Sequence, residues 1–404
     1  MSDPQASHTA TLEGLVPLEG GAGTLRLAAA LGVLGLGATA AGAALNPKDT
    51  LVSYLVAFAF WSGLSLGGLF LVMIFTAAGA RWTIVLRRAM ETLASALPLF
   101  ALLFLPIVLG ARQLYVWLEP SSLPKEAREL VEGKHAWLNL PAFLTRAAAC
   151  FGVFLLLQQL LYRWSVQQDG EGSAALTRKQ RLLSAGGLPF LALAFSVAGV
   201  DWLMTLEPTF SSTIFGIYYF AGSFLGAIAL LVVATALSKD TQSGHGPLVT
   251  PHHWHNLGKL QLAFTSFWAY IAVSQFLLIW IANLPEEIPW YILRSQGPWQ
   301  PVFVALGLGH FVLPFLALLS RDLKLQPRKM LWVGLWLLAA HWLDLTWLVV
   351  PAFHQAPFFH WTQLTAFVGV GGAAVAFALF RARGRYAVPV GDPYLDDSLR
   401  YTQP

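Results

Sequence analysis

Several ionisable side chains lie within long apolar runs of this 404-residue chain, where a charge is costly and commonly has a function. His341 precedes Asp344 by three positions, so a helix would place both side chains on one face. A carboxylate beside an imidazole at membrane depth readily exchanges protons, which indicates a proton relay. The residues that could form such a relay through the thickness of a membrane are Glu91, Lys259, His310, His341, Asp344, Asp201 and Arg112.

Simpler interpretations exist for the same residues. Asp201 with either Arg112 or Arg146 could be a buried ion pair that only fixes helix packing. Lys259 lies one turn into its run and could extend its ammonium group to the membrane interface. His310 and His341 fall at similar depth on consecutive antiparallel segments, as a bis-histidine b-type haem requires, but the sequence has no second pair of this kind.

The apolar runs themselves predict an all-α integral membrane protein. The chain is 56% hydrophobic and 11% charged, against roughly 25% charged residues in soluble domains. A membrane-spanning helix needs about 20 mainly apolar residues. Ten segments meet this length: 24–45, 51–77, 89–118, 142–164, 182–205, 214–237, 257–283, 299–320, 329–350 and 359–381. Prolines interrupt some of these runs and are expected to kink the helices: Pro98, Pro106, Pro189 and Pro314.

The distribution of Lys and Arg predicts the orientation of the ten transmembrane helices. Most basic residues outside the spans fall on the side of the N-terminus, and only Lys48, Lys125, Arg128, Lys134 and Arg294 fall on the other side. By the positive-inside rule both termini are cytoplasmic. We therefore expect a cytoplasmic N-terminal tail (1–23), a ten-helix membrane domain (24–381) and a cytoplasmic C-terminal tail (382–404). The longest loop, about 119–141, has room for one short helix.

An internal repeat predicts two related four-helix bundles. The ends of spans 5 and 9 share the pattern D-x6-P-x-F, which begins at Asp201 and at Asp344. Spans 2 and 6 each carry a G-x-x-x-G pair, Gly63/Gly67 and Gly222/Gly226, which favours close helix packing within the subunit. Both offsets equal four spans. The predicted bundles are spans 2–5 (51–210) and spans 6–9 (211–355), with spans 1 and 10 flanking them.

Other classes of function have no support in the sequence. The single cysteine, Cys150, excludes an intrachain disulfide, a Cys-ligated iron–sulfur cluster and c-type haem attachment by this chain. No P-loop, H-E-x-x-H or G-x-S-x-G motif is present. The net charge of +4 follows from topology and does not indicate nucleic acid as a partner. We assign no catalytic residue and no metal ligand.

Six segments resemble a known family. FAFWSGLSLG (58–67), RRAME (87–91) and GVDWLMTLEP (199–208) are similar to the NrfD/polysulfide reductase membrane-subunit family. STIFGIYYF (212–220), NLGKL (256–260) and WAYIAVSQFLLIWIANLPEE (268–287) resemble more narrowly the ActF subunit of bacterial alternative complex III, a quinol:cytochrome c (electron-carrier) oxidoreductase. The resemblance covers about residues 20–385.

This resemblance implies a non-haem, ten-helix subunit in the bacterial inner membrane, with a proton-conducting or assembly role and no catalysis of its own. The implied partners are a sister NrfD-like subunit, an iron–sulfur protein and haem c subunits, with a terminal oxidase as a further candidate and lipids around the helices. Haem c and iron–sulfur clusters belong to those partners, and quinone binding by this chain stays open. The alternatives are an assembly scaffold in the same kind of complex, or a stand-alone secondary transporter.

Overall fold

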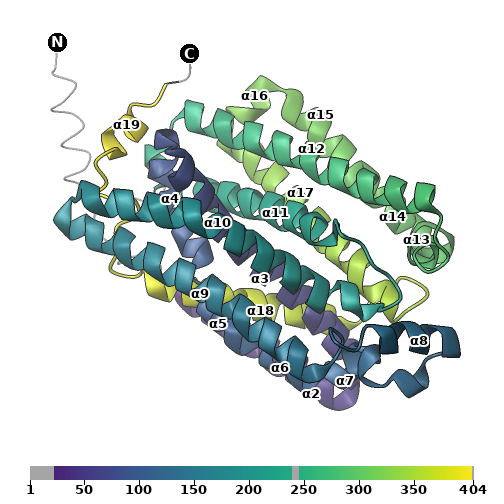
Figure 1. Ribbon diagram of the computed structural model, residues 1–404. Coiled ribbons are helices and arrows are strands. Elements are labelled where there is room, and N and C mark those ends of the chain that lie inside the picture. Colours follow the sequence, from purple (N-terminus) through teal and green to yellow (C-terminus); the bar gives the residue numbers. More distant parts are fainter. Residues whose placement is uncertain (1–21, 239–244, 403–404) are drawn as a thin grey trace, which may run out of the picture.

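The computed structural model describes residues 22–238 and 245–402, and these residues form helices joined by short turns and loops, without strands (Figure 1). Ten helical segments are long and apolar enough to cross a membrane, so the chain is an all-α, multi-pass membrane protein, as predicted. The predicted N-terminal tail lies almost wholly outside the described residues.

Seven of the ten spans are single long helices. They are α2 (Ala22–Leu45), α3 (Pro47–Ala78), α9 (Leu140–Glu171), α11 (Phe215–Leu237), α12 (Pro251–Ala282), α17 (Pro327–Val349) and α18 (Trp361–Ala382). The fifth span, α10 (Ala174–Trp202), is also one helix, and it contains Pro189 in its interior. Several of these helices begin before the apolar run does, because a helix continues past the hydrocarbon into the polar interface. One example is α12, which begins at Pro251 in place of the predicted 257, after the N-cap residue Thr250.

The third and eighth spans are interrupted helices. The third comprises α4 (Ile84–Ala94), α5 (Leu97–Leu103) and α6 (Leu105–Leu109), with Pro98 and Pro106 in the first turns of α5 and α6. The eighth comprises α14 (Gln300–Leu306), a π-helical segment (Gly307–Val312) and α15 (Leu313–Leu319). Proline lacks the amide hydrogen that a continuous helix requires, so these breaks follow from the sequence. The π-helical segment was not predicted.

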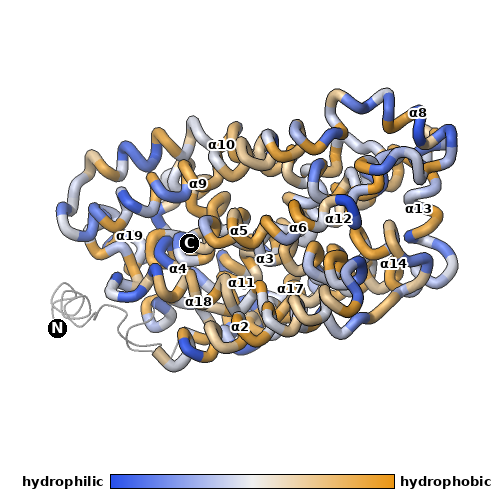
Figure 2. Tube along the Cα trace, turned by 90° about the horizontal axis from the view of Figure 1, so that it is seen from below, coloured by the Kyte–Doolittle hydropathy of each residue, from blue (hydrophilic) through white to orange (hydrophobic). Residues whose placement is uncertain are grey.

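Short elements lie between the spans and after the last one. The helices are α7 (Ala111–Leu114), α8 (Lys125–Gly133), α13 (Ile288–Ser295), α16 (Arg321–Lys324) and α19 (Leu395–Leu399). The 3-10 turns are Arg81–Thr83, Val116–Leu118, Pro120–Ser122, Met204–Leu206, Gly246–Leu248, Gly297–Trp299 and Val350–Ala352. We call the two ends of the bundle the α8 end and the α19 end; polar residues gather at both, with apolar residues between them (Figure 2). The α19 end is the predicted cytoplasmic side.

The long helices form the two predicted four-helix groups. In the first, α3 packs against α4 and α10, and α10 packs against α9. In the second, α11 packs against α12 and α17, while α12 and α17 both contact the eighth span. Helices α2 and α18 lie side by side along α3, outside both groups (Figure 1).

The contact between α3 and α11 joins the two bundles. A Cβ atom built on Gly67 would lie 2.5 Å from the Ala227 side chain, and one built on Gly63 would lie 2.5 Å from Ser223 Oγ. Only glycine allows the helices to approach this closely. The prediction that these G-x-x-x-G pairs serve packing within the subunit is confirmed for span 2.

The C-terminal segment after α18 packs across the α19 end. Asp392 pairs with Arg87 of α4, and Ser398 Oγ accepts a hydrogen bond of 3.1 Å from the Val85 amide. Farther along, the Tyr401 hydroxyl accepts a hydrogen bond of 3.0 Å from Asn256 of α12. This segment therefore contacts helices of both bundles.

Candidate functional site

Helix α17 places two of the proposed relay residues one turn apart in the interior of the second bundle. His341 and Asp344 are both 1% exposed. Asp344 Oδ1 accepts a hydrogen bond of 2.5 Å from the Tyr218 hydroxyl of α11, and its Oδ2 accepts one of 3.2 Å from Trp268 Nε1 of α12. Three helices thus converge on one carboxyl group, and both of its donors are uncharged side chains.

His310 belongs to the same group of residues. It lies in the π-helical segment of the eighth span, and π-helical turns of this kind are frequent at functional sites. Its ring centroid is 3.9 Å from that of Trp268 and 6.3 Å from that of His341. We call Tyr218, Trp268, His310, His341 and Asp344 the Asp344 cluster.

The two imidazoles of the cluster are buried without hydrogen-bond partners among the described residues. Neither ring nitrogen of His310 or of His341 has a hydrogen-bond partner among the described residues. Buried polar atoms are nearly always satisfied, so four such nitrogens in one place mark a site that can bind small polar molecules. A carboxyl, a phenol and two imidazoles within one buried site can pass a proton between them through such molecules.

Glycines of α11 make room for the His341 ring. A Cβ atom on Gly222 would lie 2.9 Å from His341 Nδ1, and one on Gly226 would lie 3.1 Å from His341 Cδ2. The second G-x-x-x-G pair therefore accommodates a side chain of the cluster, in addition to bringing helices together.

Asp201, at the corresponding point of the first bundle, has a different environment. Arg146 donates two hydrogen bonds to its carboxylate, at 2.6 and 3.1 Å, and Trp137 Nε1 donates a third at 2.9 Å. The Arg146 guanidinium also lies 4.0 Å from the centroid of the Trp137 ring. The ion-pair interpretation thus fits Asp201, and its partner is Arg146. The repeat keeps both aspartates, but among the residues that the structure describes only Asp201 is paired with a cation.

Glu91 also has its own partners in the first bundle. Arg88 Nη1 donates a hydrogen bond of 2.8 Å to Glu91, and the same guanidinium pairs with Asp169 of α9. A third hydrogen bond of Arg88, 2.9 Å long, goes to the Ser165 carbonyl oxygen. This buried group ties α4 to α9.

The remaining two candidates are exposed. Lys259 lies on the outer face of α12, and Arg112 is exposed on α7. The charge of Lys259 affects a neighbour: burial, and secondly this charge, lower the pKa of Lys324 in α16. The structure therefore brings together His310, His341 and Asp344, and leaves Glu91, Lys259, Asp201 and Arg112 with other surroundings.

A buried arginine at the α8 end holds the cluster helix in place. Arg294 of α13 is fully buried and pairs with Glu207, which follows α10. It also donates hydrogen bonds of 3.3 and 3.0 Å to the carbonyl oxygens of Trp347 and Leu348 at the end of α17. Burial lowers the pKa of Arg294, and the Glu207 carboxylate opposes this shift. The sequence placed Arg294 in a loop and gave no reason to single it out.

In the part of the chain that the structure describes, the side-chain arrangement around the cluster includes no group suited to a metal ion. The Trp268 ring packs against His310, with 3.9 Å between the ring centroids. Among the described residues, no group of three or more His, Cys, Asp or Glu side chains is arranged to hold a metal ion.

Comparisons with known proteins do not identify the chain. No protein-family model matches it, and no curated protein matches it.

Proposed function

We propose that this chain is a non-haem membrane subunit of a quinol-oxidising respiratory complex, in which the Asp344 cluster exchanges protons. The resemblance of six sequence segments to the NrfD-like and ActF-type subunits supports the complex, and the ten-helix, two-bundle architecture is consistent with it. In this proposal the chain resides in a bacterial inner membrane with both termini in the cytoplasm.

One observation carries the proposed proton exchange. Asp344 is completely buried, and its hydrogen-bond donors, Tyr218 and Trp268, are both neutral. A buried carboxylate that serves only structure is normally paired with a cation, as Asp201 is with Arg146. Asp344 lacks such a cation among its hydrogen-bond donors and belongs to one cluster with two imidazoles that have no hydrogen-bond partner among the described residues. This environment suits a group whose charge changes during turnover.

The test is proton-coupled turnover of the purified complex in reconstituted vesicles. We expect Asp344→Asn to lower it by about a hundredfold or more, the lower end of what a positioned proton-transfer group usually contributes, while the complex still assembles. Unchanged proton coupling in Asp344→Asn would show that the cluster is not a proton site.

An assembly scaffold is the second candidate function, and the two charge clusters of the first bundle favour it. Arg146 with Asp201 joins α9 to α10, and Arg88 with Asp169 joins α4 to α9. A scaffold predicts normal turnover of any complex that forms in Asp344→Asn, but a lower yield of that complex. The two functions therefore differ in one measurement.

Purification from native membranes distinguishes these two functions from that of a stand-alone transporter. We expect the chain to copurify with an iron–sulfur protein, haem c subunits and a sister NrfD-like subunit. Recovery of the chain alone or only as a homo-oligomer would contradict the respiratory-complex proposal.

A further inference from the structure

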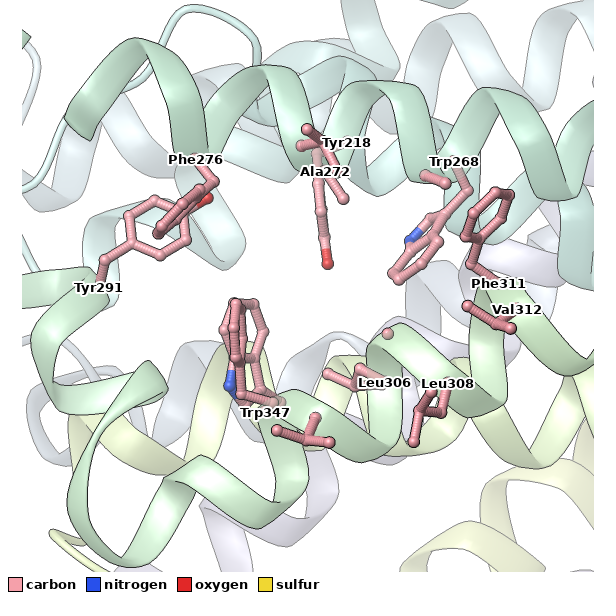
Figure 3. A pocket seen from close by; sticks show the side chains of 15 residues that line it. Tyr218, Trp268, Ala272, Phe276, Tyr291, Leu306, Leu308, Phe311, Val312 and Trp347 are labelled. Atoms are coloured by element: carbon pink, nitrogen blue, oxygen red, sulfur yellow. The ribbon is translucent and has the colours of Figure 1, made fainter. Parts of the chain in front are cut away.

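A cavity of about 450 Å³ lies between α12 and the eighth span, next to the Asp344 cluster (Figure 3). Its wall is almost entirely apolar. Seven aromatic side chains line it: Tyr218, Trp268, Phe276, Tyr291, Phe303, Phe311 and Trp347. Its volume is in the range of small-molecule sites, roughly 300–1,000 Å³.

The cavity opens toward lipid. Val273 of α12 and Val304 and Leu308 of the eighth span line it, and each of these side chains is at least half exposed on the outer face of the bundle. All three lie within membrane-spanning segments. A ligand would therefore reach the cavity from the hydrocarbon, which requires a lipid-soluble molecule.

Two phenol groups give this apolar cavity its polar features. The Tyr218 oxygen points into the space between α12 and the eighth span (Figure 3), and its proton goes to Asp344. A phenol oxygen that donates one hydrogen bond can still accept another hydrogen bond from a ligand. The Tyr291 hydroxyl accepts from Gln275 at 3.1 Å, and none of the hydrogen bonds among the described residues uses its proton. The cavity thus offers one acceptor and one donor.

We propose that this cavity binds the ring of a membrane-soluble hydroquinone or quinone. Aromatic walls favour a planar ring over an acyl chain, because stacked and edge-to-face contacts exceed what burial of area alone supplies. Tyr218 accepts a hydrogen bond from a ring hydroxyl and Tyr291 donates one to a ring oxygen, while the tail extends through the opening to lipid. The inference rests on the proposed function, since it places such a ligand beside the proton-exchange site.

Gly307 supplies a sharp test because it lines the cavity with space above it. A Cβ atom built there meets nothing within 4 Å, and its backbone is right-handed helical, with φ −57° and ψ −46°. The Cβ atom of Gly307→Leu therefore meets no protein atom at the lining of the cavity, and we expect the leucine side chain to take up part of the cavity. Gly152 of α9 is exposed, has equally open space above it and does not line this cavity, so Gly152→Leu is the matched control.

The experiment uses the full chain in lipid nanodiscs and a short-tailed azidobenzoquinone, with labelled peptides mapped by mass spectrometry. We expect labels in 269–276 and 303–312, competition by the same quinone without the azide, and about tenfold less labelling in Gly307→Leu at one subsaturating probe concentration. Gly152→Leu should label like the unaltered chain. Equal thermal unfolding of the two variants confirms that Gly307→Leu is folded.

Two results would contradict the proposed quinone site. One is labelling of these segments that Gly307→Leu leaves unchanged. The other is labelling that excess phosphatidylglycerol removes as well as quinone does, which would identify an acyl chain as the occupant. Loss of proton coupling in Asp344→Asn together with either result would leave the proposed function standing and remove only the ligand. Site-specific labelling of a chain that purifies without partners would support the quinone site and contradict the respiratory-complex proposal.

Discussion

The Tyr218 hydroxyl donates its hydrogen bond to Asp344 across the contact between α11 and α17, with 2.5 Å between the oxygens. Tyr219, the next residue, is equally buried but donates to the Ala59 carbonyl oxygen of α3, at 2.7 Å. Adjacent tyrosines thus serve different ends: one contacts a titratable group inside the second bundle, and the other joins the two bundles. This difference can be tested directly.

Tyr218→Phe should slow proton-coupled turnover by about tenfold, because one hydrogen bond to a charged group contributes ~1.5 kcal/mol. The pH profile of turnover should shift as well, since Asp344 loses one of its two donors. Tyr219→Phe should leave both the rate and the profile unchanged and affect only stability. Identical pH profiles for the two variants would contradict the assignment of Tyr218 to the proton site.

Gly222→Ala should destabilise the protein. The added methyl group would lie 2.9 Å from the His341 ring, closer than carbon and nitrogen approach without repulsion. The expected cost is about 1–3 kcal/mol, measured by thermal unfolding in detergent. Gly186→Ala on α10 is the control, because its methyl group meets nothing within 4 Å and alanine is the better helix former. Equal unfolding temperatures would show that the His341 ring moves freely.

Arg146→Leu should destabilise the first bundle by about 3–5 kcal/mol, because the buried Asp201 carboxylate would lose its counter-charge. The double variant Arg146→Leu/Asp201→Leu should recover much of this loss, since it leaves no unpaired charge. Denaturant unfolding of the unaltered protein, the two single variants and the double variant gives the coupling free energy between Arg146 and Asp201. If the two single effects simply add in the double variant, the pair does not interact as the structure shows.

His245 should make stability depend on pH. Burial lowers its pKa from 6.5 to about 4, and its Nε2 lies 3.0 Å from Thr235 Oγ1 of α11. Between these values the unfolded chain binds a proton that the folded chain does not. Stability is therefore fully present above pH 6.5, falls as the pH drops toward 4, and loses about 3 kcal/mol in total.

The measurement is thermal unfolding of the chain in detergent across this pH range. His245→Gln should reduce the pH-dependent loss of stability by about 3 kcal/mol, whereas His135→Gln, which alters an exposed loop residue, should leave it in place. A His245→Gln protein with the original pH dependence would assign the effect to other groups.

The sequence was sufficient for the spans and their grouping. Hydrocarbon thickness sets the length of a spanning helix, so ten apolar runs predicted ten helices, and the repeated Asp201 and Asp344 motifs predicted the two bundles. The spacing of His341 and Asp344 likewise placed them on one face. These features depend on local periodicity, which a single chain reveals.

Contacts between side chains on different helices could not be predicted from the sequence to the same extent. Whether Asp201 pairs with Arg112 or Arg146 depends on how α7 and α9 are positioned and rotated about their axes, and apolar helices of this kind carry little amphipathic signal to fix it. Tyr218 was missed because one tyrosine in an apolar run has no distinguishing pattern. The π-helical turn at His310 was also missed, since no local residue preference separates it from a continuous helix.

The C-terminal segment has a consequence for biosynthesis. Asp392 and Ser398 follow all ten spans in the chain, yet they supply partners for Arg87 and for the Val85 amide of the third span. The third span therefore lacks these partners for a basic side chain and a backbone amide until the segment after the tenth span has been made. An unfinished chain thus differs from a finished one at that end.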